Sequence, residues 1–165
     1  MVGAYAAAVA APPPEVRGVS ERFDPSGRDG VVVATAATFG RVAMDNAKDV
    51  LLLFHSPHSA DCLHLAPYYK KLARRLRAEH ADSVRVARFD VSAEVAPTEF
   101  HVSGLPTIVL LPANRKGPPF LYFTGEAKVL PMMLWVREHA ALHFELGELP
   151  QFDEDERSLY REQVD

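Results

Sequence analysis

The sequence "FHSPHSADCLHLAPYY" (Phe54 to Tyr69) joins an apolar run to a helical pattern and contains the only cysteine of the chain. Just before it, residues 49–56 read "DVLLLFHS", which is continuously apolar over five residues, as in a central strand covered on both faces. After Pro57 the apolar residues recur at helical spacing, and Pro67 falls inside this pattern. We expect a buried strand, a polar loop, and a long helix that kinks near residues 63–67.

The rest of the chain alternates between strand and helix patterns. Further strands are predicted at 30–35, 83–91, 105–112 and 120–125, and helices at 36–44, 93–100 and 130–144, with Ser92 as the cap of the short second one. In the long helix, one face is apolar, and its basic residues are expected to be solvated: Lys70, Lys71, Arg74, Arg75 and Arg77. The order β-α-β-α-β-α-β-β-α predicts an α/β fold with a mixed central sheet flanked by helices.

Length and composition predict one domain with two tails. The chain has 165 residues and a formal net charge of -4, and eight acidic residues lie within residues 145–165. We expect a flexible segment rich in Ala, Pro and Gly at 1–29, a domain at 30–146 and an acidic tail at 147–165. Nothing in this charge pattern suggests nucleic-acid binding, and no apolar run reaches the roughly 18–20 residues that span a membrane.

The sequence itself carries little information on location. A single cysteine excludes an internal disulfide, so cysteine usage does not indicate an oxidising compartment. The opening "MVGAYAAAVAAPPP" lacks a basic n-region and is weak as a signal peptide, and "REQVD" at the end is not a retrieval signal of the KDEL type.

Several motifs together resemble thioredoxin domains of the protein disulfide isomerase family. Such domains carry aromatic-Ala-Pro-Trp-Cys-x-x-Cys after a strand, then Leu-Ala-Pro, and later a cis-proline loop. The matching residues here are 54–62, Leu65 to Pro67, and "VSGLPTIVLLP", in which Pro106 takes the place of the cis-proline. The resemblance covers about Val31 to Phe144 and implies the thioredoxin fold. It also implies an endoplasmic reticulum location, with any membrane anchor in the parent protein rather than in this segment.

The reactive positions of this family differ in the present chain. The redox loop reads Ser59, Ala60, Asp61 and Cys62, so a serine replaces the attacking cysteine. Disulfide exchange needs a thiolate to attack and a second thiol to resolve the mixed disulfide, and a serine hydroxyl does neither. Leu53 also replaces the buried glutamate that moves protons in catalytic members. No catalytic residue and no cofactor is therefore assigned.

The resemblance implies a peptide-binding face formed by Pro57, His58, Leu105 and Pro106. We expect a redox-inactive domain that binds unfolded or partner polypeptides and assists protein folding. One alternative is a single-thiol role, in which Cys62 forms mixed disulfides; another is a purely structural domain of a larger protein.

Two more specific interpretations of the loop, a hydrolytic triad and a metal site, have less support than polypeptide binding. Ser59, a histidine and Asp61 suggest a hydrolytic triad, but no G-x-S-x-G elbow is present, and Ser59 and Asp61 equally suit the first turn of a helix. His58 and Cys62 have helical ligand spacing, yet a structural zinc site usually has two tight pairs, so no metal is expected. His55 and His58 are expected to titrate near pH 6–7.

Overall fold

The computed structural model describes residues 22–80 and 83–142. Its sheet has the strand order β1-β3-β2-β4-β5. The strands are β1 (Val32–Ala34), β2 (Asp49–His55), β3 (Val84–Asp90), β4 (Thr107–Leu111) and β5 (Leu121–Tyr122). The central strand β2 runs parallel to β3 and antiparallel to β4, and all its residues are buried, as its apolar run predicts.

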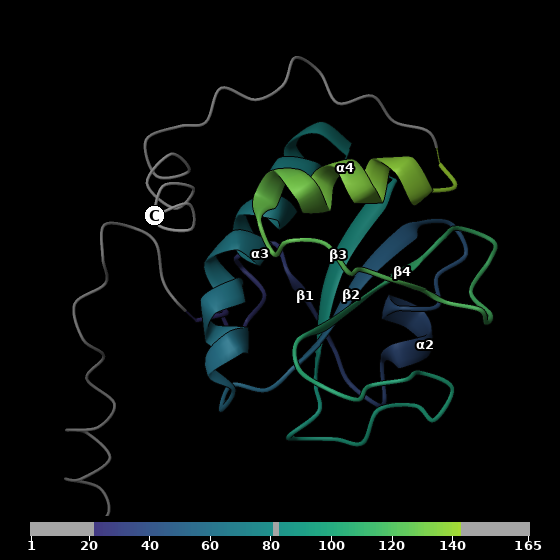
Figure 1. The fold of residues 1–165 in the computed structure, drawn as a ribbon. Coiled ribbons are helices and arrows are strands. Elements are labelled where there is room, and N and C mark those ends of the chain that lie inside the picture. Colours follow the sequence, from purple (N-terminus) through teal and green to yellow (C-terminus); the bar gives the residue numbers. More distant parts are fainter. Residues whose placement is uncertain (1–21, 81–82, 143–165) are drawn as a thin grey trace, which may run out of the picture.

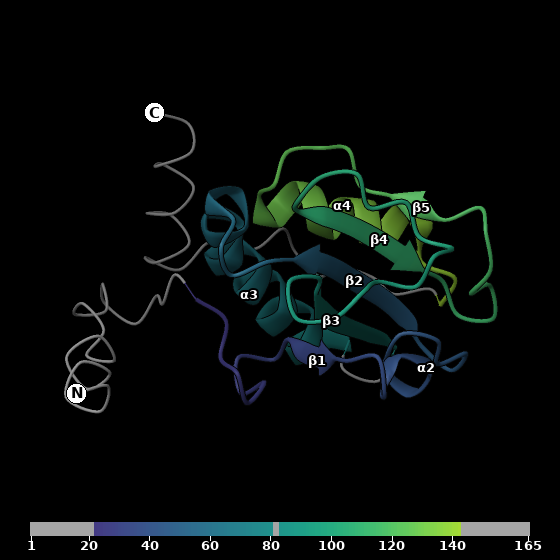
Figure 2. The same ribbon diagram turned by 90° about the horizontal axis from the view of Figure 1, so that it is seen from below.

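Helices cover both faces of this sheet (Figures 1 and 2). On one face, α3 (Ala60–His80) and α4 (Val129–His139) pack against the sheet, and Leu53, Tyr69 and Met132 belong to their common core. On the other face, α2 (Phe39–Val42) lies over a second core that contains Phe54 and Phe100. Successive residues of β2 thus point alternately into two cores. A shift of one residue would exchange the two sets of side chains, so burial on both faces fixes the register of the strand. None of the helices in the described part of the chain is long and apolar enough to cross a membrane.

The predicted fold class is confirmed, with one element missing. The five predicted strands and the helices around α2, α3 and α4 are present, and Pro67 lies inside α3. The short helix predicted at 93–100 does not form. Ser92 does not cap it, because its N–H and its hydroxyl both donate to the Asp90 carboxylate, at 2.9 and 2.6 Å. Pro97, which has no N–H to give and restricts the residue before it, keeps the following segment in turns.

Residues 22–29, which we name the N-terminal strap, pack against the domain. The Nζ of Lys70 donates to the Arg22 carbonyl at 2.6 Å, and Nη2 of Arg88 donates to the Asp24 carbonyl at 3.1 Å. Lys70 and Lys71 are both buried, and the prediction that they are solvated was wrong. The packed part of the chain extends to Arg22, upstream of the boundary expected at residue 30. Residues 1–21 and the acidic tail at 147–165 lie outside the described residues.

A buried carboxylate ties three distant segments together at the start of β2. Asp49 is fully buried and accepts hydrogen bonds from the backbone N–H groups of Ala113 at 2.8 Å and of Ala141 and Leu142 at 2.9 Å. These donors come from the turn after β4 and from the end of α4. Nearby, Nζ of Lys116 donates to the carbonyls of Lys48 and Leu111 at 2.6 and 2.5 Å. This network lies at the opposite end of β2 from the redox loop.

Candidate functional site

The redox loop begins α3 with hydroxyl groups. The Ser56 hydroxyl oxygen accepts from the His58 N–H at 3.1 Å, and the Ser59 N–H donates to the Ser56 carbonyl at 3.2 Å. The Ser59 hydroxyl oxygen then accepts from the Cys62 N–H at 3.3 Å. Ser59 is thus the N-cap of α3, with Asp61 in the first turn, as the sequence suggested. The position that holds the attacking thiol in catalytic relatives is therefore occupied here by the serine hydroxyl that caps α3.

Cys62 faces inward one turn later. Cys62 is only 2% exposed and is a free thiol, whereas Ala60 and Asp61, which precede it in the first turn of α3, are exposed. A thiol without access to solvent is a poor nucleophile, because its sulfur cannot contact the disulfide that it would attack. The geometry therefore gives Cys62 the character of a small core residue.

The pairing of β2 with β4 brings the two halves of the predicted peptide-binding face to one edge of the sheet. Phe54 lies opposite Thr107 in this antiparallel pair. The chain therefore leaves β2 toward Pro57 and His58 at the edge where Leu105 and Pro106 lead into β4. Pro57 and His58 are exposed, Leu105 and Pro106 are partly exposed, and the Leu105–Pro106 bond is cis. The strand register thus brings the four residues to the same end of β2 and β4, and polypeptide binding by them stays a prediction.

His55 is a buried base beside a cation, contrary to the expectation that it titrates near pH 6–7. Its Nε2 lies 3.3 Å from Nη1 of Arg88, and its ring packs edge-on against Phe23 of the N-terminal strap, with ring centres 5.3 Å apart. Burial, and then the charge of Arg88, lower the pKa of His55 to about 4, although the Asp90 carboxylate opposes this shift. His55 is accordingly neutral at pH 7.

Arg88 is a buried residue near the candidate site that the sequence pattern did not single out. It lies beside Leu53 in the β2–β3 register and is buried, with its guanidinium 5.0 Å from the centre of the Phe23 ring. Its Nε is buried and has no hydrogen-bond partner. A charged residue inside an alternating strand pattern is expected to face solvent, so only tertiary contacts reveal it. The domain therefore has a buried guanidinium, that of Arg88, on β3 beside Leu53 of β2, the strand that leads into the redox loop.

The two sharper interpretations of the loop gain no support. The Ser59 hydroxyl oxygen caps α3, and Nε2 of His55 faces Arg88, so these groups serve structural contacts rather than a triad. Across residues 22–80 and 83–142, no group of three or more His, Cys, Asp or Glu side chains is placed to hold a metal ion. His58 and His64 are exposed while Cys62 is buried, so the helical spacing alone does not make a ligand set.

The burial of His55 predicts that acid destabilises the domain. The folded pKa of about 4 lies below the ordinary value of 6.5, so the unfolded chain binds the proton more tightly. The stability associated with neutral His55 is fully present above pH 6.5 and is lost as the pH falls toward 4, by about 3 kcal/mol at most. Urea unfolding at pH 7 and pH 4.5 measures this loss. His55→Phe should flatten the pH dependence, and an unchanged slope would contradict the assignment to His55.

Comparison with known proteins identifies the family of the chain. The Thioredoxin family matches residues 30–128, which is more than half of the chain. The chain belongs to the thioredoxin family. Its relatives are disulfide isomerases: it is 36% identical over 110 residues to "Protein disulfide-isomerase" of Humicola insolens, covering 66% of this chain and 21% of that protein. Over 111 residues it is 31% identical to human "Protein disulfide-isomerase A4", covering 67% of this chain and 17% of the relative.

Solved structures agree on the fold. The first thioredoxin domain of mouse protein disulfide-isomerase A4 superposes with a TM-score of 0.60 at 23% identity, covering 88% of this chain and 98% of that one. Human ERp44 in its zinc-bound form gives a TM-score of 0.57 at 18% identity, covering 66% of this chain and 31% of that one. The chain spans about a fifth of the length of the curated relatives it matches. A narrower resemblance, of residues 86–92 and 105–117 to the last thioredoxin domain of thioredoxin domain-containing protein 11, stays a prediction.

Proposed function

We propose that this chain is a redox-inactive, disulfide-isomerase-like thioredoxin domain that binds unfolded or partner polypeptides and assists protein folding in the secretory pathway. The observation that carries the proposal is the replacement of the attacking cysteine by Ser59, whose hydroxyl is committed to capping α3. With one thiol in the loop, no internal disulfide can form there, so the dithiol cycle has neither its attacker nor its product.

Two residues around the redox loop also disfavour disulfide exchange. Leu53 is fully buried where catalytic relatives carry an acid, and its neighbour in the sheet is Arg88 rather than a proton acceptor. His55 is neutral at pH 7 and held by Arg88, so it does not supply a cationic charge that would lower the pKa of a nearby thiol. Neither group supports proton transfer to or from a thiol in the loop.

The residues proposed to bind polypeptide, in contrast, keep the arrangement that the resemblance implies. Pro57 and His58 stay exposed at the edge where the cis Leu105–Pro106 bond enters β4. An extended polypeptide placed along this edge can donate to and accept from backbone groups, with side chains meeting His58 and Leu105. The 2% exposure of Cys62 argues against the single-thiol alternative. The endoplasmic reticulum location rests on the resemblance to disulfide isomerases.

Binding of a polypeptide without free thiols tests this function. Carboxymethylated insulin B chain, labelled with a fluorophore, should bind the wild-type domain, and the fluorescence anisotropy of the labelled peptide should rise on binding. His58→Ala and Leu105→Ser should each weaken binding by about tenfold, because each removes a side-chain contact at the edge and tenfold corresponds to about 1.4 kcal/mol. His64→Ala, which changes an exposed histidine on α3, is the matched control and should bind like wild type. Equal affinities for all four proteins would exclude this surface.

A further inference from the structure

The last turns of α3 carry a basic surface that the candidate site does not use. Arg74, Arg75 and Arg77 lie within four positions of the helix. Arg74 and Arg77 are exposed and Arg75 is partly exposed, whereas Leu72 and Leu76 are fully buried and face the core. We name the three arginines the basic face of α3. Since Arg74 and Arg77 are three residues apart, they are neighbours on the helix surface.

The helix dipole accounts for only part of this basic face. Cations are favourable near the C-terminal end of a helix, but the effect falls off within the last turn. α3 ends at His80, so Arg77 lies within that turn and Arg74 lies about one turn further back. The exposed cluster of Arg74 and Arg77 therefore suits an acidic polypeptide segment beyond what the dipole requires.

The chain itself contains such a segment. Residues 153–156 read Asp-Glu-Asp-Glu, and residues 145–165 hold eight acidic residues against two arginines. The structure fixes the point from which this acidic tail starts. Leu142 is the last described residue before it, and its N–H donates to the Asp49 carboxylate at 2.9 Å. The tail therefore starts at the end of the sheet where β2 begins.

The end of α3 lies beside this starting point. The Asp49 N–H donates to the Ser83 carbonyl at 2.9 Å, and Ser83 follows His80, the last residue of α3, by three positions. Asp49 thus contacts both the residue before the tail and the connection after α3. Figure 1 shows the C-terminal ends of α3 and α4 in the upper part of the view, above the loops that follow β2 and β3.

The tail is long enough to reach the basic face of α3. The contacts of Asp49, the three residues from His80 to Ser83 and the rise of the helix together place Arg74 within about 30 Å of Leu142. The eleven residues from Leu142 to Asp153 span up to about 36 Å when extended. Four consecutive acidic side chains can therefore meet the arginines of α3.

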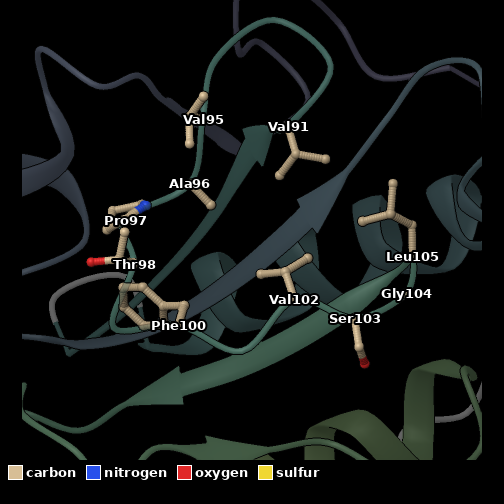
Figure 3. A pocket seen from close by; sticks show the side chains of 10 residues that line it. All are labelled: Val91, Val95, Ala96, Pro97, Thr98, Phe100, Val102, Ser103, Gly104 and Leu105. Carbon is tan, nitrogen blue, oxygen red and sulfur yellow. The ribbon is translucent and has the colours of Figure 1, made fainter.

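The candidate site lies at the other end of the sheet. Arg74 is about 21 Å along α3 from Ala60, where the helix starts after the redox loop. The open pocket of about 500 Å³ shown in Figure 3 is also at that end, since its lining runs from Val91, after β3, to Leu105, before β4. A segment bound to the basic face of α3 therefore leaves the redox loop and this pocket unobstructed.

We propose that residues 153–156 of the acidic tail bind the basic face of α3 within the same chain. Each ion pair at a wet surface contributes little, so the contact needs several pairs at once. The covalent connection supplies the local concentration, which is about millimolar for a short linker. An acidic segment of another protein would bind this face only by displacing the tail, so the tail controls access to it. This contact does not depend on the proposed function.

A disulfide placed across the contact tests this proposal in the full chain. Ala78 is exposed one turn after Arg74, and Ser158 follows the four acidic residues, so Ala78→Cys and Ser158→Cys are combined in a Cys62→Ala background. In about 0.01 M salt, mild oxidation should close an intrachain disulfide. Arg74→Glu with Arg77→Glu should slow the closure at least about tenfold, since the rate follows the effective concentration of the tail at α3. Raising the salt to about 1 M, where the Debye length is about 3 Å, should also slow it.

Three controls separate charge pairing from other effects of the substitutions. Arg41→Glu with Arg115→Glu, at exposed arginines outside α3, makes the same change in net charge and should leave the rate unchanged. Alkylation of each thiol by iodoacetamide corrects for altered thiol reactivity. The rate should return when Arg74→Glu and Arg77→Glu are combined with four substitutions in the tail: Asp153→Lys, Glu154→Lys, Asp155→Lys and Glu156→Lys.

The other outcomes contradict the proposal. Equal rates for the parent protein, the Arg74→Glu/Arg77→Glu variant and the Arg41→Glu/Arg115→Glu control, with all three folded by circular dichroism, overturn it, and so does the absence of any intrachain closure. A rate that falls with salt but not with Arg74→Glu and Arg77→Glu places the tail on another surface and overturns it too. Disulfides between two chains, whose yield rises with protein concentration, assign the acidic segment to the α3 of a second copy.

Discussion

Ser59→Cys is expected to give the domain a disulfide reductase activity that we expect the wild-type domain not to have. The new thiol takes the place of a hydroxyl whose oxygen lies 3.3 Å from the Cys62 N–H, at the start of a helix of 21 residues. The helix N-terminus stabilises a thiolate, and Cys62 is then in position to resolve the mixed disulfide. With dithiothreitol as the reductant, the variant should reduce insulin at least about tenfold faster than wild type.

The restored rate should still be limited by the groups beneath the loop. Leu53 provides no acid to move the proton of Cys62, so we expect turnover well below that of an intact disulfide isomerase. Ser59→Cys in a Cys62→Ser background is the control: it should form mixed disulfides with insulin and turn over much more slowly, because only dithiothreitol is left to cleave them. A folded Ser59→Cys variant that oxidises to an internal disulfide and yet fails to reduce insulin would contradict the view that Ser59 blocks the cycle.

Asp49→Ala is expected to destabilise the domain by about 3–5 kcal/mol, because three buried backbone donors lose a charged acceptor. The loss should appear as a lower urea midpoint at constant pH. Asp49→Asn, which keeps the shape and one acceptor oxygen, should lose about half as much. The affinity for carboxymethylated insulin B chain should not change under native conditions, since Asp49 starts β2 and the peptide-binding face lies past its other end.

Asp45→Ala is the matched control for this substitution. The Asp45 carboxylate lies 3.2 Å from Nη2 of Arg85, and both side chains are partly exposed to water. An ion pair that water screens in this way contributes little to stability, so Asp45→Ala should lower the urea midpoint much less than Asp49→Ala. Equal losses for Asp45→Ala and Asp49→Ala would show that the buried carboxylate does not hold β4 and α4 in place.

The sequence predicted those parts of the fold that local pattern determines. The apolar run from Val50 to Phe54 indicated the central strand, and the spacing of Leu65, Tyr69 and Leu72 indicated the buried face of α3. Ser59 was predicted as the cap of that helix, and it is one. In each case neighbouring residues carry the signal, because periodicity and capping depend on positions within one or two turns.

The errors concern groups whose partners are distant in the sequence. Lys70 is buried because its ammonium reaches the Arg22 carbonyl, 48 residues away. No local pattern encodes such acceptors. The helix expected at 93–100 failed partly for the same reason. Glu94 accepts from the distant Ala36 N–H, whereas Ser92, the expected cap, donates to the neighbouring Asp90 carboxylate.

Insulin reduction by the wild-type protein tests the central claim most directly. In dithiothreitol, with a catalytic amount of the domain, the account predicts a rate equal to that of the reductant alone. The reason is that Ser59 cannot attack a disulfide and Cys62 is buried. Sustained turnover above that background, lost on Cys62→Ser, would contradict the account and assign a redox role to the single thiol.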